Sequence, residues 1–330
     1  MTEPTLRDDR PDEPAVVALG GGHGLAASLS ALRHVTTKLT AVVTVADDGG
    51  SSGRLRQEFG VLPPGDLRMA LAALCGDDDW GRTWSRLVQH RFDGDGSLRG
   101  HAMGNLLIVG LTELLGDPIE ALDWVGRLLG AEGRVLPMSR EPLDIVADVV
   151  GQDSSRPLEV CEVHGQVAVA TASGQVTRVR LIPSSPLACP EAVATIRSAD
   201  WVILGPGSWF TSVIPHLLIP ELAQAIVETQ ARRLVTLNLA PQPGETSGFS
   251  PEQHLEVLAE HAPKLRLDVV LADESTVTDI DALRDVSSAF GAELVLAQVA
   301  SPDGSPRHDP EQLAAAYASL LTHGRIHPWR

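Results

Sequence analysis

Hydrophobic positions near the start of the chain follow two periodicities in turn. An apolar run rich in β-branched residues, Ala15–Leu19, meets a glycine cluster and is followed by apolar residues at helical spacing, Leu25, Leu29 and Leu32. A second apolar run, Thr40–Val45, leads into the sequence DDGGSSG. This order predicts a strand, a tight turn, a helix and a second buried strand, which together form a β-α-β unit. Ligands of such sheets bind at the carboxyl ends of the strands.

Two insertions are expected in the middle of the chain. Four stretches with helical apolar spacing, separated by Gly, Asp and Pro, predict a helical insert over about 64–130: Pro64–Cys75, Trp80–His90, Gly104–Leu115 and Pro118–Leu129. Between about 143 and 182 the pattern changes to alternation of apolar and polar residues, as in EVCEV at 159–163. That alternation predicts a small antiparallel β insert.

Alternation of strands and helices resumes after Pro190. Apolar runs predict strands at Trp201–Leu204, Leu234–Leu239, Leu267–Leu271 and Glu293–Val299, and helical spacing predicts helices at Ile214–Thr229, Pro251–Ala262 and Pro310–Leu321. The whole pattern is typical of an α/β protein with a mostly parallel sheet. Because no linker rich in Pro, Gly or Ser divides the chain, we expect a single domain over 15–330, after a disordered lead over 1–14.

Composition restricts the class of partner. The 330 residues carry a formal net charge of −17, which argues against DNA or RNA, since nucleic-acid affinity comes largely from Lys and Arg. A local pocket for one anionic small molecule stays compatible with that charge. The absence of long apolar runs predicts no membrane insertion. Cys75, Cys161 and Cys189 lack zinc-ligand spacing, and the polar N-terminus lacks the order of a secretory signal, so we expect a cytoplasmic protein.

The first candidate site is the glycine turn after the first strand, which includes Gly21, Gly22, His23 and Gly24. A helix N-terminus that follows a strand presents backbone N–H groups and favours negative charge, so the turn predicts a phosphate cradle. A merely tight turn between strand and helix is the alternative. The turn does not fit the dinucleotide fingerprint, because Leu25 stands at the position of its third glycine. A dinucleotide nevertheless stays an alternative ligand.

Polar residues at the end of the second predicted strand form the next candidate group. Asp47 and Asp48 have the placement of carboxylates that bind a ribose or hold Mg²⁺ against phosphate oxygens. Ordinary Asp-Gly turn chemistry is the alternative. Ser51 and Ser52 follow with hydroxyl donors suited to an anion, and Arg54 adds a guanidinium.

Two further motifs begin predicted helices. Asp66 in PPGDLR suits an N-terminal capping role. His101 and Asn105 are four residues apart and so share one helix face, where they could grip one ligand or serve the structure alone.

The second half of the chain repeats the logic of strand, glycine turn and helix. Its candidate residues are Gly205, Pro206, Gly207 and Ser208 after one strand, Asn238 at the end of the next, Gln242 and Thr246 in the loop that follows, and Arg307 before the last helix. Arg307 could supply a cation to a phosphate or simply precede the helix. The sequence holds no HExxH or DFG motif, which leaves an anion and nucleotide site.

Seven segments together closely resemble the gluconeogenesis factor family of YvcK-like proteins. They are ALGGGHG at 18–24, VVTVADDGGSSG at 42–53, VLPPGDLR at 61–68, GHAMGNLL at 100–107, ILGPGS at 203–208, TSVIP at 211–215 and QPGET at 242–246. The family is related to CofD-like 2-phospholactate transferases, which use Mg²⁺ to join a phospholactyl group from a guanylylated donor to a deazaflavin precursor. The resemblance implies a Rossmann-like three-layer α/β/α fold.

The resemblance also implies roles for the candidate residues. The two glycine turns would touch a diphosphate, and Asp47 and Asp48 would take the place of the acidic pair that holds the metal in the transferase branch. Residues that would line the base and sugar or reach the anion are Asn105, Asn238, Gln242, Thr246 and Arg307. His23 stands where the family usually has Thr, which removes a hydroxyl donor beside the phosphate.

Two functions follow as hypotheses. The first is a regulator that binds a UDP-sugar, notably UDP-N-acetylglucosamine, and links carbon metabolism to cell-wall synthesis and cell shape. Its expected partners are a protein of cell-wall synthesis and, in a homo-oligomer, further copies of the chain. The second is a Mg²⁺-dependent transferase of the CofD type, whose chemistry needs positioning and charge neutralisation more than a nucleophile.

Overall fold

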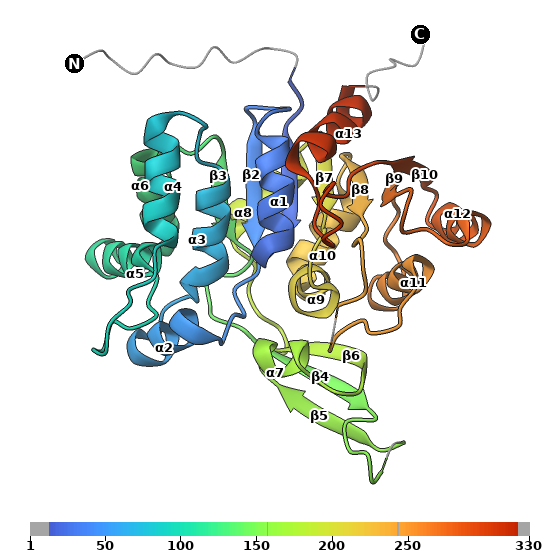
Figure 1. The fold of residues 1–330 in the computed structure, drawn as a ribbon, viewed down its shortest axis with the longest axis horizontal. Helices are drawn as coiled ribbons and strands as arrows, with labels where there is room; N and C mark the ends of the chain where they lie inside the picture. The colour runs from blue at the N-terminus through green and yellow to red at the C-terminus, as the bar shows by residue number, and fades with distance from the viewer. Residues whose placement is uncertain (1–12, 157, 243, 323–330) are drawn as a thin grey trace.

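The computed structural model describes residues 13–156, 158–242 and 244–322 (Figure 1). Its main sheet has seven strands in the order β10-β9-β8-β7-β1-β2-β3, and every pair of neighbouring strands is parallel. The strands are β1 Val16–Gly20, β2 Leu39–Val43, β3 Arg134–Pro137, β7 Trp201–Leu204, β8 Arg232–Thr236, β9 Val269–Asp273 and β10 Glu293–Ala297. The expected parallel sheet is therefore confirmed.

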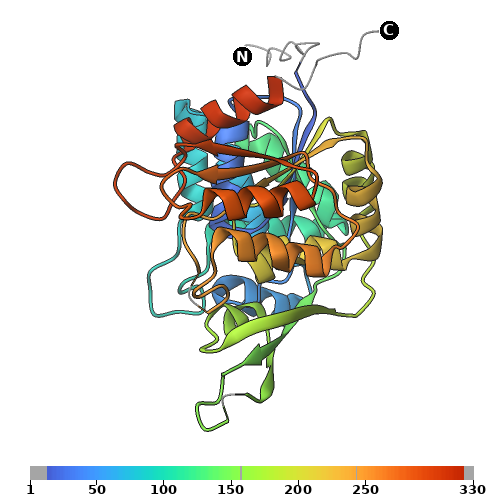
Figure 2. The ribbon, with the colours of Figure 1, turned by 90° about the vertical axis from the view of Figure 1, so that its right-hand side faces the viewer.

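Helices cover both faces of this sheet, which makes the expected three layers (Figures 1 and 2). Helices α1, α3 and α13 lie on one face, and α8 and α10 lie on the other. The helices are α1 Gly22–Leu32, α2 Gly50–Phe59, α3 Pro64–Ala73, α4 Asp79–Gln89, α5 Met103–Leu115, α6 Pro118–Leu129, α8 Pro190–Ser198, α9 Pro215–Leu218, α10 Pro220–Glu228, α11 Pro251–His261, α12 Ile280–Ala289 and α13 Pro310–Thr322. The central strand β1 is buried along its whole length because both of its faces are covered.

The region over 143–182 forms the expected antiparallel insert. Its strands are β4 Asp144–Val150, β5 Val160–His164 and β6 Gln175–Ile182, arranged in the order β5-β4-β6, with the short helix α7, Gln166–Ala170, between β5 and β6. In Figure 1 the insert lies below the main sheet, whereas the described chain begins and ends at the opposite side. The insert therefore lies at the carboxyl ends of β1 and β2, where Asp48 contacts α7.

Several elements differ from the sequence-based expectation. The segment after Asp48 continues as helix α2, and α8, α12 and β3 were not predicted. The helix expected over 214–229 is divided into α9 and α10, because Pro220 lacks an amide hydrogen and begins a new helix. A π-helical turn, η1 Trp209–Val213, precedes them. Most of the disordered lead expected over 1–14 lies outside the described residues, and the division into a single domain stays a prediction.

Candidate functional site

Two glycine turns meet at the carboxyl ends of the neighbouring strands β1 and β7. The first turn, Gly21–Gly24, opens α1, and the second, Gly205–Ser208, opens η1. A Cβ atom built on Gly24 would lie 2.3 Å from the carbonyl oxygen of Pro206 and 2.4 Å from Cα of Gly207. The two backbones are therefore in direct contact, and only glycine fits at position 24.

The start of α1 has the character of an anion site. Gly21 is its N-cap and supplies no side-chain acceptor, and the first turn holds no acidic residue. The Gly22 amide donates to Asp66, and no N-cap side chain covers the N–H groups that follow it, with the positive end of the helix dipole behind them. His23 in this turn is exposed and lines a groove between α1, α3 and α4.

Asn238 has a bracing role that the sequence did not indicate. Its Oδ1 accepts a hydrogen bond from the Gly207 amide at 2.9 Å, and its Nδ2 donates to the Gly207 carbonyl at 2.8 Å. Both polar groups of the side chain are thus engaged with the second glycine turn. The contact with base or sugar that the resemblance implies stays a prediction, and the observed contacts make Asn238 a support for the turn.

Carboxylates of Asp47 and Asp66 converge beneath the first glycine turn. A Cβ on Gly21 would lie 2.5 Å from Asp66 Oδ2, and a Cβ on Gly65 would lie 2.6 Å from Asp47 Oδ2. Burial, together with the charge of Asp47, raises the pKa of Asp66 to about 7, although the Gly22 amide donates to it. Among the described residues, the buried Oδ2 of Asp66 has no hydrogen-bond partner. A buried carboxylate of this kind is suited to a proton or a cation.

The expected acidic pair is divided between two locations. Asp47 Oδ1 accepts from the Gly49 amide at 2.9 Å, whereas Asp48 Oδ1 accepts from the Val167 amide of α7 at 3.0 Å. A joint metal-binding role of Asp47 and Asp48 stays a prediction. In this structure Asp48 caps a helix of the insert, and the carboxylate placed beside Asp47 is that of Asp66.

The residues present fit a hydrated Mg²⁺ ion only in part. In the described ranges no group of three or more His, Cys, Asp and Glu side chains could hold a metal. Mg²⁺ commonly binds to one or two carboxylates and completes its coordination with water and substrate phosphate. The unpartnered Asp66 oxygen and the neighbouring Asp47 supply that minimum, so they are the residues that would hold the ion.

A buried polar network flanks the carboxylates. Arg68 Nε donates to Asn105 Oδ1 at 2.9 Å, and Asn105 Nδ2 donates to Ser51 Oγ at 3.0 Å. Ser51 Oγ also lies 3.0 Å from His101 Nδ1. Burial, together with the charge of Arg91, lowers the pKa of Arg68. The expected shared helix face is wrong, because α5 begins at Met103 and His101 precedes it. His101 and Asn105 nevertheless share Ser51 as a partner, and Arg68 joins them through a contact that the sequence did not reveal.

The remaining predicted residues differ in their burial and in their contacts. Ser52 is buried close to Gly65, where a Cβ would lie 2.4 Å from its Oγ. Thr246 is fully buried, and its Oγ1 accepts from the Gln242 amide at 2.9 Å inside their own loop. Gln242 Oε1 is buried and has no hydrogen-bond partner in the part of the chain that the structure describes. Arg307 is exposed, follows the edge strand β10, and makes no side-chain hydrogen bond or ion pair within the described ranges.

Glu245 braces the site through contacts that the sequence did not reveal. Its Oε2 accepts from the Phe210 amide at 3.0 Å and its Oε1 from Thr211 Oγ1 at 2.5 Å. The side chain is 2% exposed, and this burial raises the pKa of the carboxyl group. Glu245 thereby fixes the start of η1, immediately after the second glycine turn. Its place in the QPGET motif was the available signal.

Replacement of Glu245 tests this bracing role. Glu245→Ala is expected to lower the free energy of unfolding by about 2–3 kcal/mol, because it leaves a buried amide and a buried hydroxyl without acceptors. Glu245→Gln keeps one acceptor and should lose less. Urea denaturation monitored by tryptophan fluorescence measures both values. Equal losses in the two variants would contradict the hydrogen-bonding role.

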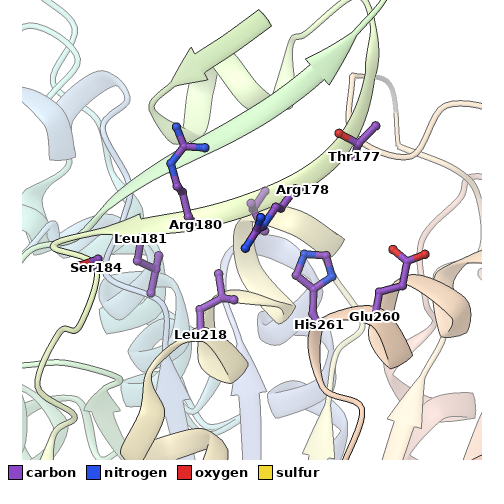
Figure 3. A pocket seen from close by; sticks show the side chains of 9 residues that line it. Thr177, Arg178, Arg180, Leu181, Ser184, Leu218, Glu260 and His261 are labelled. Atoms are coloured by element: carbon purple, nitrogen blue, oxygen red, sulfur yellow. The ribbon is translucent and has the colours of Figure 1, made fainter. Parts of the chain in front are cut away.

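A separate cleft of about 400 Å³ lies between β6 and helices α9 and α11 (Figure 3). Arg178 and Arg180 both line it; Arg178 extends toward His261, whereas the guanidinium of Arg180 points away from His261. Arg180 pairs with Asp148 at 2.8 Å and also with Glu162. None of the residues predicted for the ligand site lines this cleft. The cleft is therefore distinct from the centre at the glycine turns.

Comparison with known proteins identifies the class. The family described as 2-phospho-L-lactate transferase CofD matches residues 16–294, so the chain belongs to the CofD family. Within it, a gluconeogenesis factor of Mycobacterium tuberculosis is 55% identical over 303 residues, covering 91% of this chain and 88% of that protein. The gluconeogenesis factor of Bacillus subtilis is 33% identical and covers 94% of this chain and 98% of its own.

A solved structure supports the fold. The crystal structure of a UPF0052-family protein from Bacillus halodurans matches with a TM-score of 0.81 and 31% sequence identity, covering 92% of this chain and 98% of that chain. No helix in the described ranges is long and apolar enough to span a membrane.

Proposed function

We propose that the protein binds a nucleotide sugar through the two glycine turns and acts as a cytoplasmic regulator. The observation that carries the proposal is the packing of Gly24 against Pro206 and Gly207, which places two backbone turns and a helix N-terminus without an N-cap side chain at one point. Such a point suits a diphosphate, because its charge is met by oriented N–H groups. The choice of a UDP-sugar, with UDP-N-acetylglucosamine first, rests on the resemblance to gluconeogenesis factors.

The regulatory role follows from the same resemblance. We infer that the occupied protein links carbon metabolism to cell-wall synthesis and cell shape through a protein partner in cell-wall synthesis. The insert is the element best placed to report occupancy, because it contacts two loops of the centre. Asp48 caps α7, and a Cβ on Gly244 would lie 2.1 Å from the Ala170 carbonyl oxygen.

A Mg²⁺-dependent transfer reaction of the CofD type is the second candidate. The family match and the Asp47–Asp66 pair favour it. When bound, Mg²⁺ would neutralise phosphate charge and help to orient the donor. The chain itself would contribute the N–H groups at the start of α1 and the buried Arg68, which together offset the negative charge of a donor phosphate.

Isothermal titration calorimetry distinguishes the two functions. UDP-N-acetylglucosamine, UDP-glucose, GDP and NADP would each be titrated into the protein with and without Mg²⁺. The regulator predicts micromolar binding of a UDP-sugar that is independent of Mg²⁺. Binding of a guanine nucleotide alone, and only with Mg²⁺, would contradict the regulator and favour the transferase.

The variant Asp47→Asn sharpens this test. Without a bridging metal, removing a carboxylate beside the diphosphate should strengthen binding, because repulsion is reduced. If Mg²⁺ connects Asp47 to the phosphates, the same change should weaken binding by about tenfold or more. Asp285→Asn, on the exposed surface of α12, makes the same change of charge away from the site and serves as the control.

A further inference from the structure

The cleft between β6 and helices α9 and α11 combines apolar and charged side chains (Figure 3). Its volume of about 400 Å³ is within the range of pockets that hold small molecules. Leu181 and Leu218 supply apolar surface, whereas Arg178 and His261 supply polar groups. A few polar groups beside apolar surface are typical of pockets that bind and orient a small ligand.

Arg178 brings a positive charge that the protein itself does not neutralise. Its side chain is exposed and forms no ion pair or hydrogen bond with the residues that the structure describes. Arg180 differs, because Asp148 and Glu162 already pair with it. The guanidinium of Arg178 therefore has its N–H donors available to an anion in the cleft.

His261 adds a polar atom that lacks a partner. Its Nδ1 donates to the Val257 carbonyl at 2.9 Å, since a carbonyl oxygen can only accept. Nε2 is then the remaining ring nitrogen, and it is buried without a hydrogen-bond partner among the described residues. The ring of Phe210 packs edge-on against the imidazole, with 6.1 Å between centroids, and restricts its orientation. A ligand oxygen would supply the missing partner of Nε2.

Further polar groups of the lining suit hydroxyl groups of a ligand. Thr177 and Ser184 provide side-chain hydroxyls toward opposite ends of the cleft, and the exposed carboxylate of Glu260 lies beside His261 (Figure 3). A carboxylate repels an anion, but it accepts hydrogen bonds from hydroxyl groups. The strand β6 is also an edge strand, so one row of its backbone N–H and C=O groups is not used by the sheet.

We propose that this cleft binds a phosphate monoester of a small hydroxylated compound. The phosphate contacts Arg178 and His261, because the N–H groups of a guanidinium match two phosphate oxygens and a protonated phosphate oxygen donates to Nε2. The hydroxyl groups of the ligand bond to Glu260, and its carbon atoms pack over Leu181 and Leu218. No residue of the two glycine turns lines the cleft, so this site is additional to the proposed nucleotide site.

The ligand would connect the insert to the main fold. Arg178 belongs to β6 of the insert, whereas His261 ends α11, a helix beside the main sheet. A molecule held by both side chains stabilises the arrangement of these two elements. Binding should therefore raise the melting temperature of the protein.

Isothermal titration calorimetry with glycerol 3-phosphate and ribose 5-phosphate tests the proposal, with inorganic phosphate and glycerol as the reference ligands. At least one ester is expected to bind with a dissociation constant below about 1 mM and about tenfold or more tightly than inorganic phosphate. Arg178→Gln should weaken binding of that ester by about tenfold or more, because it removes the charge-assisted hydrogen bonds. His261→Asn should weaken it by about threefold or more.

Arg197→Gln, at an exposed position of α8 away from the cleft, makes the same change of charge as Arg178→Gln and should keep wild-type affinity. Circular dichroism confirms that each variant is folded. Esters that bind no more tightly than inorganic phosphate would overturn the proposal. A folded Arg178→Gln variant with wild-type affinity would also overturn it, because the ester would then bind elsewhere, for example at the glycine turns. These titrations contain no nucleotide sugar, so their outcome is independent of the proposed function.

Discussion

Gly24→Ala is expected to abolish nucleotide binding and to lower the free energy of unfolding by about 2–4 kcal/mol. The added methyl group would lie 2.3 Å from the Pro206 carbonyl oxygen, a distance at which backbone must move. The second turn cannot move freely, because Asn238 holds Gly207 through two hydrogen bonds. Forcing the turns apart displaces the N–H groups that the proposed diphosphate requires.

The two effects of Gly24→Ala are measured separately. Urea denaturation gives the stability, and calorimetry with UDP-N-acetylglucosamine gives the affinity at a temperature where the variant is folded. Gly110→Ala in α5 is the control, because a Cβ there meets nothing within 4 Å. Alanine in a helix interior should stabilise that variant by up to about 1 kcal/mol. Wild-type stability of Gly24→Ala would contradict the close packing, and loss of stability with full affinity would contradict the proposed site alone.

Strands of the main sheet were predictable because they are buried on both faces. Short, continuous apolar runs such as Ala15–Leu19 and Trp201–Leu204 are typical of strands buried in a parallel sheet. The edge strand β3, Arg134–Pro137, is only four residues long and lies between a helix end and a loop, so its short run gave no distinct period. Helix α2 was hidden because its first turn, Gly50–Gly53, has the composition of a turn.

The candidate site was predictable in location and less so in its contacts. Parallel strands end at one edge, so the glycine turns after β1 and β7 were expected to meet there. The direction of a side chain in a loop depends on its tertiary partners, which the sequence does not encode locally. Asp48 accepts a hydrogen bond from the Val167 amide at the start of α7, a helix that lies more than a hundred residues further along the chain. Asp66 looked like an ordinary cap, and only its burial beside Asp47 distinguishes it.

Asp66 is expected to make the stability of the ligand-free protein depend on pH. Its pKa is about 7 in the folded protein against an ordinary value of 3.8, so between about pH 4 and 7 the folded state holds a proton that the unfolded state has lost. The free energy of unfolding should therefore fall as the pH rises through this interval, by up to about 4 kcal/mol. Asp66→Asn removes the titrating group and should flatten the profile.

Chemical denaturation from pH 4 to pH 8.5 measures this profile, with and without Mg²⁺. Above pH 7 the ionised Asp66 and Asp47 repel each other inside the protein, so a cation held between them should restore stability in the wild type and not in Asp66→Asn. Asp285→Asn, an exposed change of the same kind, should leave the profile unaltered. If Asp66→Asn kept the full wild-type slope, the buried carboxylate could not be its source. If Mg²⁺ stabilised both proteins equally above pH 7, the ion would bind elsewhere.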